Sequence, residues 1–205
     1  MTTESRTTGD LTQSELTIIR SAYRTIARGG SQRMSLREIA EDAGVSKALL
    51  LYHFGSKDNL LLAAMKWAVE RTEQRIRERL EASSGAPDQI TALVEAIFVG
   101  PEANRDFYAF YLDLVEHVAR VPGFGSLSQM LDEIINGLYS EVAEAGIEEG
   151  VFEVSDLAGT ARSMRAVIEG TFVQWIQTPD WRDNHAEWKE GCRRALLRLL
   201  GVRPG

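Results

Sequence analysis

The sequence predicts an all-α protein of about nine helices, in which a small helix-turn-helix domain precedes a larger helical domain. Apolar residues recur every three or four positions through nearly the whole chain, which is the spacing of a buried helix face. Helix-capping residues and Gly or Pro breaks separate these periodic segments. Residues 151–154 are the only β-like run, and they are too few to found a sheet.

The first helix is predicted from Thr12 to Arg28, because Thr12 and Glu15 have capping-box spacing and Gly29-Gly30 ends the pattern. Further helices are predicted at about 35–43, 46–54, 57–80, 88–99, 104–120, 126–145, 155–177 and 186–200. Their expected boundaries include Asn104 as a cap, Pro122-Gly-Phe-Gly as a break, Gly146 to Phe152 as a closing segment and Ser155 as a start. We expect a disordered tail at 1–11, the helix-turn-helix domain at 12–57 and the larger domain at 58–205.

Two short helices joined by a tight turn follow the first helix. Ser35 and Glu38 have the spacing of a second capping box. Gly44 suits the turn, because glycine adopts a positive φ without strain, and Ser46 can cap the next helix. Leu50 is the bulky residue expected between the pair. This arrangement is typical of motifs that place their second helix in the major groove of DNA.

The segment AGVSKALLLYHFGSKDNLL resembles the DNA-binding signature of the TetR family of bacterial transcriptional regulators. The close resemblance covers roughly residues 14–62, and beyond it the likeness is one of helical architecture and length. One departure is Leu51, where many family members carry a tyrosine whose hydroxyl meets a DNA phosphate. Leu51 cannot make that contact, but it can touch a thymine methyl or the sugar backbone.

The resemblance implies which residues contact DNA. Arg37 and Lys47 fall where family members reach base edges, and both side chains can donate to guanine. The alternative is that they are only solvated surface charges. Tyr52, His53 and Lys57 fall where the family meets phosphates. With two serines that bring helix N-termini toward the backbone, the expected DNA-binding residues are Arg37, Ser46, Lys47, Leu51, Tyr52, His53, Ser56 and Lys57.

The distribution of charge agrees with a DNA-binding N-terminal part. The chain of 205 residues has a net charge of −7. Residues 1–58 hold eight Lys and Arg against seven Asp and Glu, whereas the remainder holds 15 against 23. The acidity therefore lies away from the expected DNA contact, and local charge decides that contact. The chain lacks the apolar run of a membrane span or signal peptide, so we expect a cytoplasmic protein.

The segment 155–177 has two apolar faces that lie nearly opposite each other on a helix. The large face, which belongs in a core, is Leu157, Ala161, Met164, Ile168, Phe172 and Trp175. The small face, formed by Gly159, Ser163, Ala166, Gly170 and Val173, allows another helix to approach closely. The final helix carries an apolar stripe that could pack against it. We expect a homodimer interface from these two surfaces; the alternative is packing within one subunit. The predicted interface residues are Gly159, Ser163, Ala166, Gly170, Val173, Trp188, Cys192, Ala195 and Leu199.

The segment 104–120 is rich in aromatic residues. An aromatic stripe at helical spacing is often plain core, but the corresponding helices of TetR regulators enclose a ligand cavity. Two tyrosines and a histidine could orient a mostly apolar ligand there. The resemblance therefore implies a small-molecule site among Trp67, Phe98, Phe107, Tyr108, Tyr111, His117, Met130, Met164, Phe172 and Trp175.

Enzymatic interpretations find little support. No histidine follows a glutamate by three positions, as a di-iron bundle requires, and one cysteine with three histidines does not make a zinc site. The common phosphate-loop and hydrolase strings are absent from the sequence. We expect no catalysis, no cofactor and no bound metal. Cys192 lies on an apolar stripe and is expected to be inert core, the alternative being a redox sensor.

The sequence as a whole predicts a homodimeric transcriptional regulator, a repressor that a small-molecule ligand releases from a palindromic DNA operator. Within the same mechanism, the alternative is an activator or a DNA-binding regulator without a ligand. The alternative from another class is a helical ligand-binding or catalytic protein whose N-terminal motif no longer binds DNA. Salt-dependent binding to a palindromic duplex separates the two classes.

Overall fold

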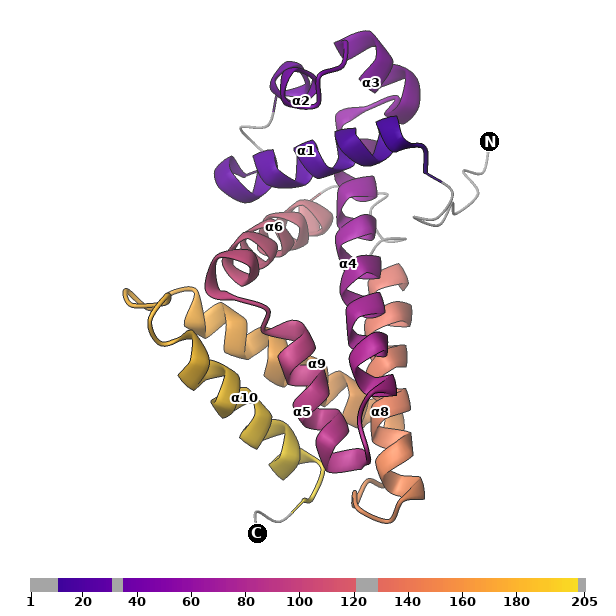
Figure 1. Ribbon diagram of the computed structural model, residues 1–205, viewed down its shortest axis with the longest axis vertical. Coiled ribbons are helices and arrows are strands. Elements are labelled where there is room, and N and C mark those ends of the chain that lie inside the picture. The colour runs from indigo at the N-terminus through magenta and orange to yellow at the C-terminus, as the bar shows by residue number, and fades with distance from the viewer. Residues whose placement is uncertain (1–10, 31–34, 121–128, 203–205) are drawn as a thin grey trace. The chain divides into compact units, whose positions relative to one another are not determined.

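The computed structural model in Figure 1 describes residues 11–30, 35–120 and 129–202. Its regular elements in these ranges are all helices, which confirms the predicted fold class. No helix in the described ranges is long and apolar enough to cross a membrane. The elements are α1 (Gln13–Gly29), α2 (Leu36–Asp42), α3 (Lys47–Phe54), α4 (Lys57–Glu81), α5 (Ala86–Ile97), α6 (Pro101–Arg120), the π-helical turn η2 (Asp132–Asn136), α8 (Gly137–Glu148), α9 (Leu157–Trp175) and α10 (His185–Leu199).

The chain divides into two compact units. The first comprises Met1–Arg71 with Ala109–Pro122, and the second comprises Thr72–Tyr108 with Gly123–Gly205. Both α4 and α6 therefore contribute to each unit. The first unit holds α1, α2 and α3 together with the beginning of α4, whereas the second holds α5 and α8 to α10.

Helix α1 begins and ends where the sequence predicts. The Thr12 hydroxyl accepts from the backbone N–H of Glu15 at 3.2 Å, and the Glu15 carboxylate accepts from the N–H of Thr12 at 2.8 Å. This reciprocal pair satisfies two donors that a helix start leaves open. At the other end Gly30 takes a φ of +76°. The predicted capping box and glycine stop are both confirmed.

The core of the first unit forms along the inner faces of α1 and α4. Tyr23 meets the edges of two rings, with centroids 5.4 Å from Phe110 and 5.8 Å from Trp67. Large side chains that are less than 2% exposed fill the rest: Ile18, Ile19, Ile26, Ile39, Leu50, Leu60, Leu61 and Met65. Burying such side chains is the main term that stabilises a domain of this size.

In the second unit, α9 contacts α8 and α10, and α5 contacts both of these helices in turn (Figure 1). The large face of α9 is buried as predicted except at its first residue: Ala161, Met164, Ile168, Phe172 and Trp175 are at most 2% exposed, whereas Leu157 is half-buried. Helix α9 starts at Leu157 and not at Ser155, because Asp156 supplies the cap by accepting from the N–H of Gly159 at 2.9 Å.

Three other predicted boundaries are wrong. Asn104 does not cap α6, which begins at Pro101; its amide is buried, donates to the carbonyl of Ile97 at 2.8 Å and accepts from the N–H of Gly100 at 3.3 Å. Gly146 does not end its helix, and α8 continues to Glu148. A Cβ at Gly146 would lie 1.9 Å from the Phe152 ring, so glycine is required there by packing. Helix α5 also starts at Ala86, two residues before the predicted start.

The helix predicted at 126–145 contains a feature that its sequence did not reveal. Residues 132–136 form the π-helical turn η2, directly before α8. This turn contacts α9, where the Arg165 guanidinium binds Asp132 and, at 2.6 Å, Glu169. The break predicted at 122–125 and the tail at 1–10 lie outside the described residues.

Candidate functional site

The turn between α2 and α3 has the geometry that the sequence predicts. Gly44 takes a φ of +67°, and the N–H of Val45 donates to the carbonyl of Ala40 at 2.9 Å. The Ser46 hydroxyl caps α3 by accepting from the N–H of Leu49 at 3.1 Å. At the start of α2, the Ser35 hydroxyl accepts from the N–H of Arg37 instead of the expected Glu38. The turn is therefore fixed by local bonds on both sides.

An ion pair holds α2 against α1. Arg24 on α1 binds the Asp42 carboxylate at 2.7 Å. Hydrogen bonds from the Ser21 hydroxyl and then from Arg24 hold the pKa of Asp42 below its usual value. Since Asp42 is the last residue of α2, these bonds fix the approach to the turn and so the direction in which α3 starts.

The expected DNA-binding residues lie on the surface of the first unit. Tyr52 is 83% exposed, the highest value among the exposed large apolar side chains in the described part of the chain. The Arg37 side chain is 82% exposed and pairs with Glu41 at 2.8 Å, so a base contact must compete with this ion pair. Of the other predicted residues, Ser46 and Lys47 are exposed, whereas Leu51, His53, Ser56 and Lys57 are half-buried.

His53 has a neighbour that sequence reasoning missed. Its Nδ1 lies 3.5 Å from a carboxylate oxygen of Glu15, on α1. The Glu15 side chain is only 7% exposed and the His53 side chain 17%. The sequence pattern assigns Glu15 only to the capping box, because a cap joins neighbouring residues, whereas the contact with His53 joins α1 to α3.

The aromatic residues of the second unit pack on one another. Phe172 stacks on Phe98 at 4.2 Å and on Tyr108 at 4.0 Å between ring centroids, and it meets the edge of Trp175 at 5.9 Å. The Trp175 indole N–H donates to the carbonyl of Trp181 at 2.6 Å. Four of the predicted ligand residues therefore form one buried aromatic cluster.

The other predicted ligand residues are divided between the units. Trp67 and Tyr111 belong to the first unit, where Trp67 faces Tyr23. In the second unit, Phe107 and Met130 are half-buried and Met164 is fully buried. The side chain of His117 lies outside the described residues.

Two polar residues, Asn104 and His185, lie beside the aromatic cluster, and the sequence did not predict either of them as part of the site. His185 lies with its ring 5.1 Å from that of Trp175 and its Nε2 2.9 Å from the Asn104 amide oxygen. Because an amide oxygen only accepts, Nε2 of His185 donates in this hydrogen bond. Burial lowers the pKa of His185, and the Lys189 charge lowers it further. A neutral histidine at the start of α10 gave no signal in the sequence.

The predicted interface residues differ in what surrounds them within one chain. A Cβ at Gly170 would meet nothing within 4 Å, so this part of the small face is open. A Cβ at Gly159 would lie 2.1 Å from the Asp156 carboxylate, so the helix cap explains that glycine. Cys192 is 1% exposed, and burial raises the pKa of its thiol to about 11. Ser163, Val173, Trp188 and Ala195 are half-buried, and Ala166 and Leu199 are exposed.

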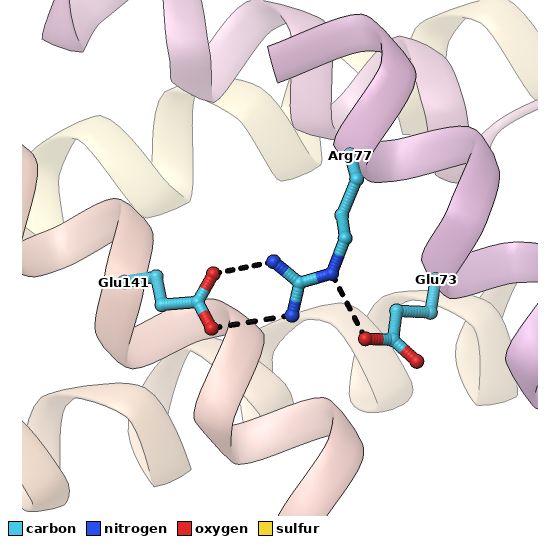
Figure 2. Close-up of polar contacts among 3 residues, drawn as sticks. All are labelled: Glu73, Arg77 and Glu141. Atoms are coloured by element: carbon cyan, nitrogen blue, oxygen red, sulfur yellow. Dashed lines mark hydrogen bonds and ion pairs between the residues drawn. The ribbon is translucent and has the colours of Figure 1, made fainter. Parts of the chain in front are cut away.

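The C-terminal part of α4 belongs to the second unit, where its side chains bind two other helices of that unit, α5 and α8. Figure 2 shows Arg77 between two carboxylates: both of its terminal nitrogens bind Glu141 on α8, at 2.6 and 3.2 Å, and its Nε binds Glu73 at 2.9 Å. The guanidinium of Arg75 donates to the carbonyl of Ala96 on α5 at 2.6 Å. A bidentate pair fixes orientation as well as distance.

Two family models match the chain. The model of bacterial regulatory proteins of the tetR family matches residues 18–64, and the model of the C-terminal part of BetI-type transcriptional repressors matches residues 86–201. The chain is 30% identical over 163 residues to the HTH-type transcriptional regulator BetI of Brucella anthropi, covering 77% of this chain and 78% of that protein. It is 25% identical over 163 residues to BetI of Brucella suis, covering 77% of each.

Solved structures share the fold. A transcriptional regulator from Saccharomonospora viridis, in complex with choline, superposes with a TM-score of 0.79 at 23% identity, covering 91% of this chain and 96% of that one. A TetR-family transcriptional regulator from Rhodococcus sp. has the same TM-score at 21% identity, covering 93% and 100%. At this level of identity the likeness establishes the fold alone.

Proposed function

Because the chain belongs to the TetR family of bacterial regulatory proteins and is a DNA-binding transcriptional regulator, we propose that it is a homodimeric repressor that a small molecule releases from a palindromic operator. The observation that carries this proposal is the α2–α3 turn, fixed by local hydrogen bonds, with an exposed tyrosine on α3. In this proposal the protein acts on DNA in the cytoplasm and catalyses no reaction.

Helix α3 enters the major groove in this proposal. Lys47 at its start and Arg37 on α2 face base edges, where each can donate to guanine. Tyr52, His53 and Lys57 contact phosphates, which supply affinity without sequence information. Leu51, Ser46 and Ser56 complete the contact surface through the sugar backbone and the helix N-termini. The exposure of Arg37, Lys47 and Tyr52 supports this assignment.

Two copies are needed because one α3 reads only half of a palindrome. Two recognition helices must lie about 34–36 Å apart to enter successive major grooves. The open surface beside Gly170 supports a dimer through α9, together with the exposed Ala166 and Leu199. Cys192 is not part of this proposal, since its own subunit already covers it.

A quaternary ammonium compound is the ligand class that we propose first. The related regulator from Saccharomonospora viridis was crystallised in complex with choline. Aromatic faces attract such cations, and the second unit gathers Phe98, Tyr108, Phe172 and Trp175 in one cluster. Because Phe98 and Tyr108 stack on Phe172, the cation must separate these rings to reach their faces. The net negative charge of residues 59–205 also favours a cationic ligand.

The ligand would act through α4, whose first residue is the proposed phosphate contact Lys57. The contacts of Arg75 and Arg77 tie the other end of this helix to α5 and α8. A ligand that moves those helices would move α4 and misplace Lys57. To take the operator-bound population from 99:1 to 1:99, the ligand must prefer the released form by about 5.5 kcal/mol, shared between two subunits.

Selection of duplexes from a random pool by the purified protein tests DNA binding, and the selected duplex becomes the probe for choline. We expect a palindromic sequence and an affinity that falls steeply with salt. Choline should weaken binding to that duplex, and the duplex should weaken choline binding by the same factor. A pool without any enriched sequence would contradict the repressor proposal. Equal choline affinities with and without duplex would exclude choline as the inducer.

A further inference from the structure

The indole of Trp181, in the segment between α9 and α10, already binds cations of the protein itself. The guanidinium carbons of Arg105 and Arg182 lie over its ring, 4.4 and 4.7 Å from the ring centroid. At such distances the negative face of an aromatic ring attracts a cation. Arg182 also binds the Glu102 carboxylate at 2.6 Å. An aromatic face and a carboxylate therefore meet around one positive charge.

These groups lie at the surface of the second unit, next to the aromatic cluster. The side chains of Arg182 and Glu102 are 63% and 61% exposed, and Trp181 is half-buried. The Trp181 carbonyl accepts from the indole N–H of Trp175 at 2.6 Å, and the two rings meet edge to face with centroids 5.8 Å apart. Trp181 thus adjoins the cluster, but a cation can reach it without separating the stacked rings.

We propose that the Trp181 ring and the Glu102 carboxylate form the site that receives the ammonium group of a quaternary ammonium ligand, and that Arg182 occupies this site until the ligand displaces it. Guanidinium and quaternary ammonium groups are both cations that aromatic faces bind. The ligand class is that of the proposed function, on which this assignment therefore rests. None of these three residues belongs to the ligand residues predicted from the sequence.

The contact that the ligand must break is a weak one. Ion pairs between exposed side chains contribute little to stability, because water and salt screen them and two long side chains lose freedom. The contact between Arg182 and Glu102 is of this kind. A displaced guanidinium regains hydrogen bonds with water, whereas a quaternary ammonium group has no N–H to donate to water. The ligand therefore loses less hydration at the Trp181 ring than Arg182 does.

Two variants that break the same ion pair distinguish this competition from a structural role. Arg182→Gln removes the competing cation and leaves the carboxylate, whereas Glu102→Gln removes the carboxylate and leaves the cation. If the ion pair only fastened the segment after α9 to α6, both variants would change the affinity for choline in the same direction. Competition for one site requires opposite directions.

Calorimetric titration of the full chain with choline measures these effects. Arg182→Gln should bind choline about two- to fivefold more tightly than the wild-type protein, the range expected for one exposed cation contact. Glu102→Gln and Trp181→Leu should each bind it more weakly by a similar factor. Arg105→Gln is the matched control: it also removes a guanidinium from the ring, but Glu102 stays paired with Arg182, so the affinity should rise less.

Neohexyl alcohol, in which a carbon atom replaces the nitrogen of choline, is the control for charge. Because this isostere is neutral, its affinity should be the same for the wild-type protein and Arg182→Gln. A gain in its affinity equal to that of choline would show that the variant only opens space, and would overturn the inference.

Further outcomes separate this site from the proposed function. Equal choline affinities of the wild-type protein and Arg182→Gln, or shifts in the same direction for Arg182→Gln and Glu102→Gln, would overturn the inference and leave the ligand class standing. Choline that binds with the expected pattern but does not release the selected duplex would support this site and overturn the inducer proposal. An absence of choline binding in both the wild-type protein and Arg182→Gln would overturn the site and the ligand class together.

Discussion

We expect that some side chains of the proposed DNA-contact surface select the sequence of the operator and that others supply affinity for any duplex. Arg37→Ala should cost about 1–3 kcal/mol on the operator and relax selectivity at one base pair, because a guanidinium can bind both acceptors of guanine. Lys57→Ala is the comparison, because the proposed contact of Lys57 is with a phosphate, which is the same in every DNA sequence. It should weaken all duplexes alike and lower the salt slope by about one charge.

Both variants are measured by titration against the selected duplex and a random duplex at several salt concentrations. Arg37 already pairs with Glu41 at 2.8 Å, so Glu41→Gln should strengthen operator binding slightly by freeing the guanidinium. Equal losses on both duplexes for Arg37→Ala would show that this residue reads no base.

His185 is expected to make the folded state sensitive to acid. Burial lowers its pKa below the ordinary value of 6.5, so the unfolded chain binds a proton more readily than the native protein. The contribution of His185 to the free energy of unfolding is therefore complete above about pH 6.5, and it decreases as the pH falls below that value. His185→Gln, which can still donate to Asn104, should remove this contribution.

Urea unfolding at pH 7.5 and pH 5.5 measures the effect of His185. The midpoint of the wild-type protein should fall more on acidification than the midpoint of His185→Gln, because other groups contribute equally to both proteins. The same drop in the two proteins would contradict the prediction.

At the scale of whole helices, Arg77 is expected to couple α4 to α8. Arg77→Met keeps the apolar stem but loses both carboxylate contacts, at a cost of about 0.5–1 kcal/mol in stability for this partly exposed network. If α4 carries the ligand signal, this variant should keep its operator affinity within about twofold but need more ligand for release. Arg79→Met is the control, since Arg79 makes a longer contact of 3.5 Å with Glu95.

Thermal unfolding and operator release by titrated choline are measured for both variants. Release curves of Arg77→Met that superpose on those of the wild-type protein would show that the signal does not pass through this contact.

The helices that sequence predicts well are those whose ends depend on neighbouring residues. The Thr12 cap, the Gly44 turn and the Ser46 cap each join positions within five residues. Apolar spacing was likewise enough to identify the buried face of α9. Local signals therefore revealed the fold class and the turn of the candidate DNA-binding site.

Elements that depend on distant partners were missed. Asn104 has the chemistry of a cap, but it is held inside α6 by His185, 81 residues away. Gly146 has the chemistry of a stop, but the ring of Phe152 requires it within α8. Glu15 satisfied a local pattern so completely that its contact with His53 gave no additional signal. No periodicity distinguishes the π-helical turn η2 from an ordinary helix.

For the molecule as a whole, charge and symmetry have separate roles. Residues 1–58 are nearly neutral overall, so the proposed DNA contacts depend on single cations placed on α2, α3 and the start of α4. The remaining residues carry the net negative charge, which disfavours nonspecific association of that part with DNA. The proposed function therefore uses two copies, because in this proposal each copy supplies few cations and one recognition helix.

The dimer is therefore the last feature to test, and Gly170 is the position at which to test it. A Cβ at Gly170 would meet nothing within 4 Å in its own chain, so we expect Gly170→Leu to leave the subunit folded. In the proposed dimer, the new side chain overpacks a close helix crossing, at about 1–3 kcal/mol or more for each copy. Sedimentation should show monomers, and operator affinity should fall sharply because one α3 binds half a site. Ser163→Ala is the control, since it removes an oxygen from the same face without adding volume. A Gly170→Leu protein that still sediments as a dimer would place the interface elsewhere.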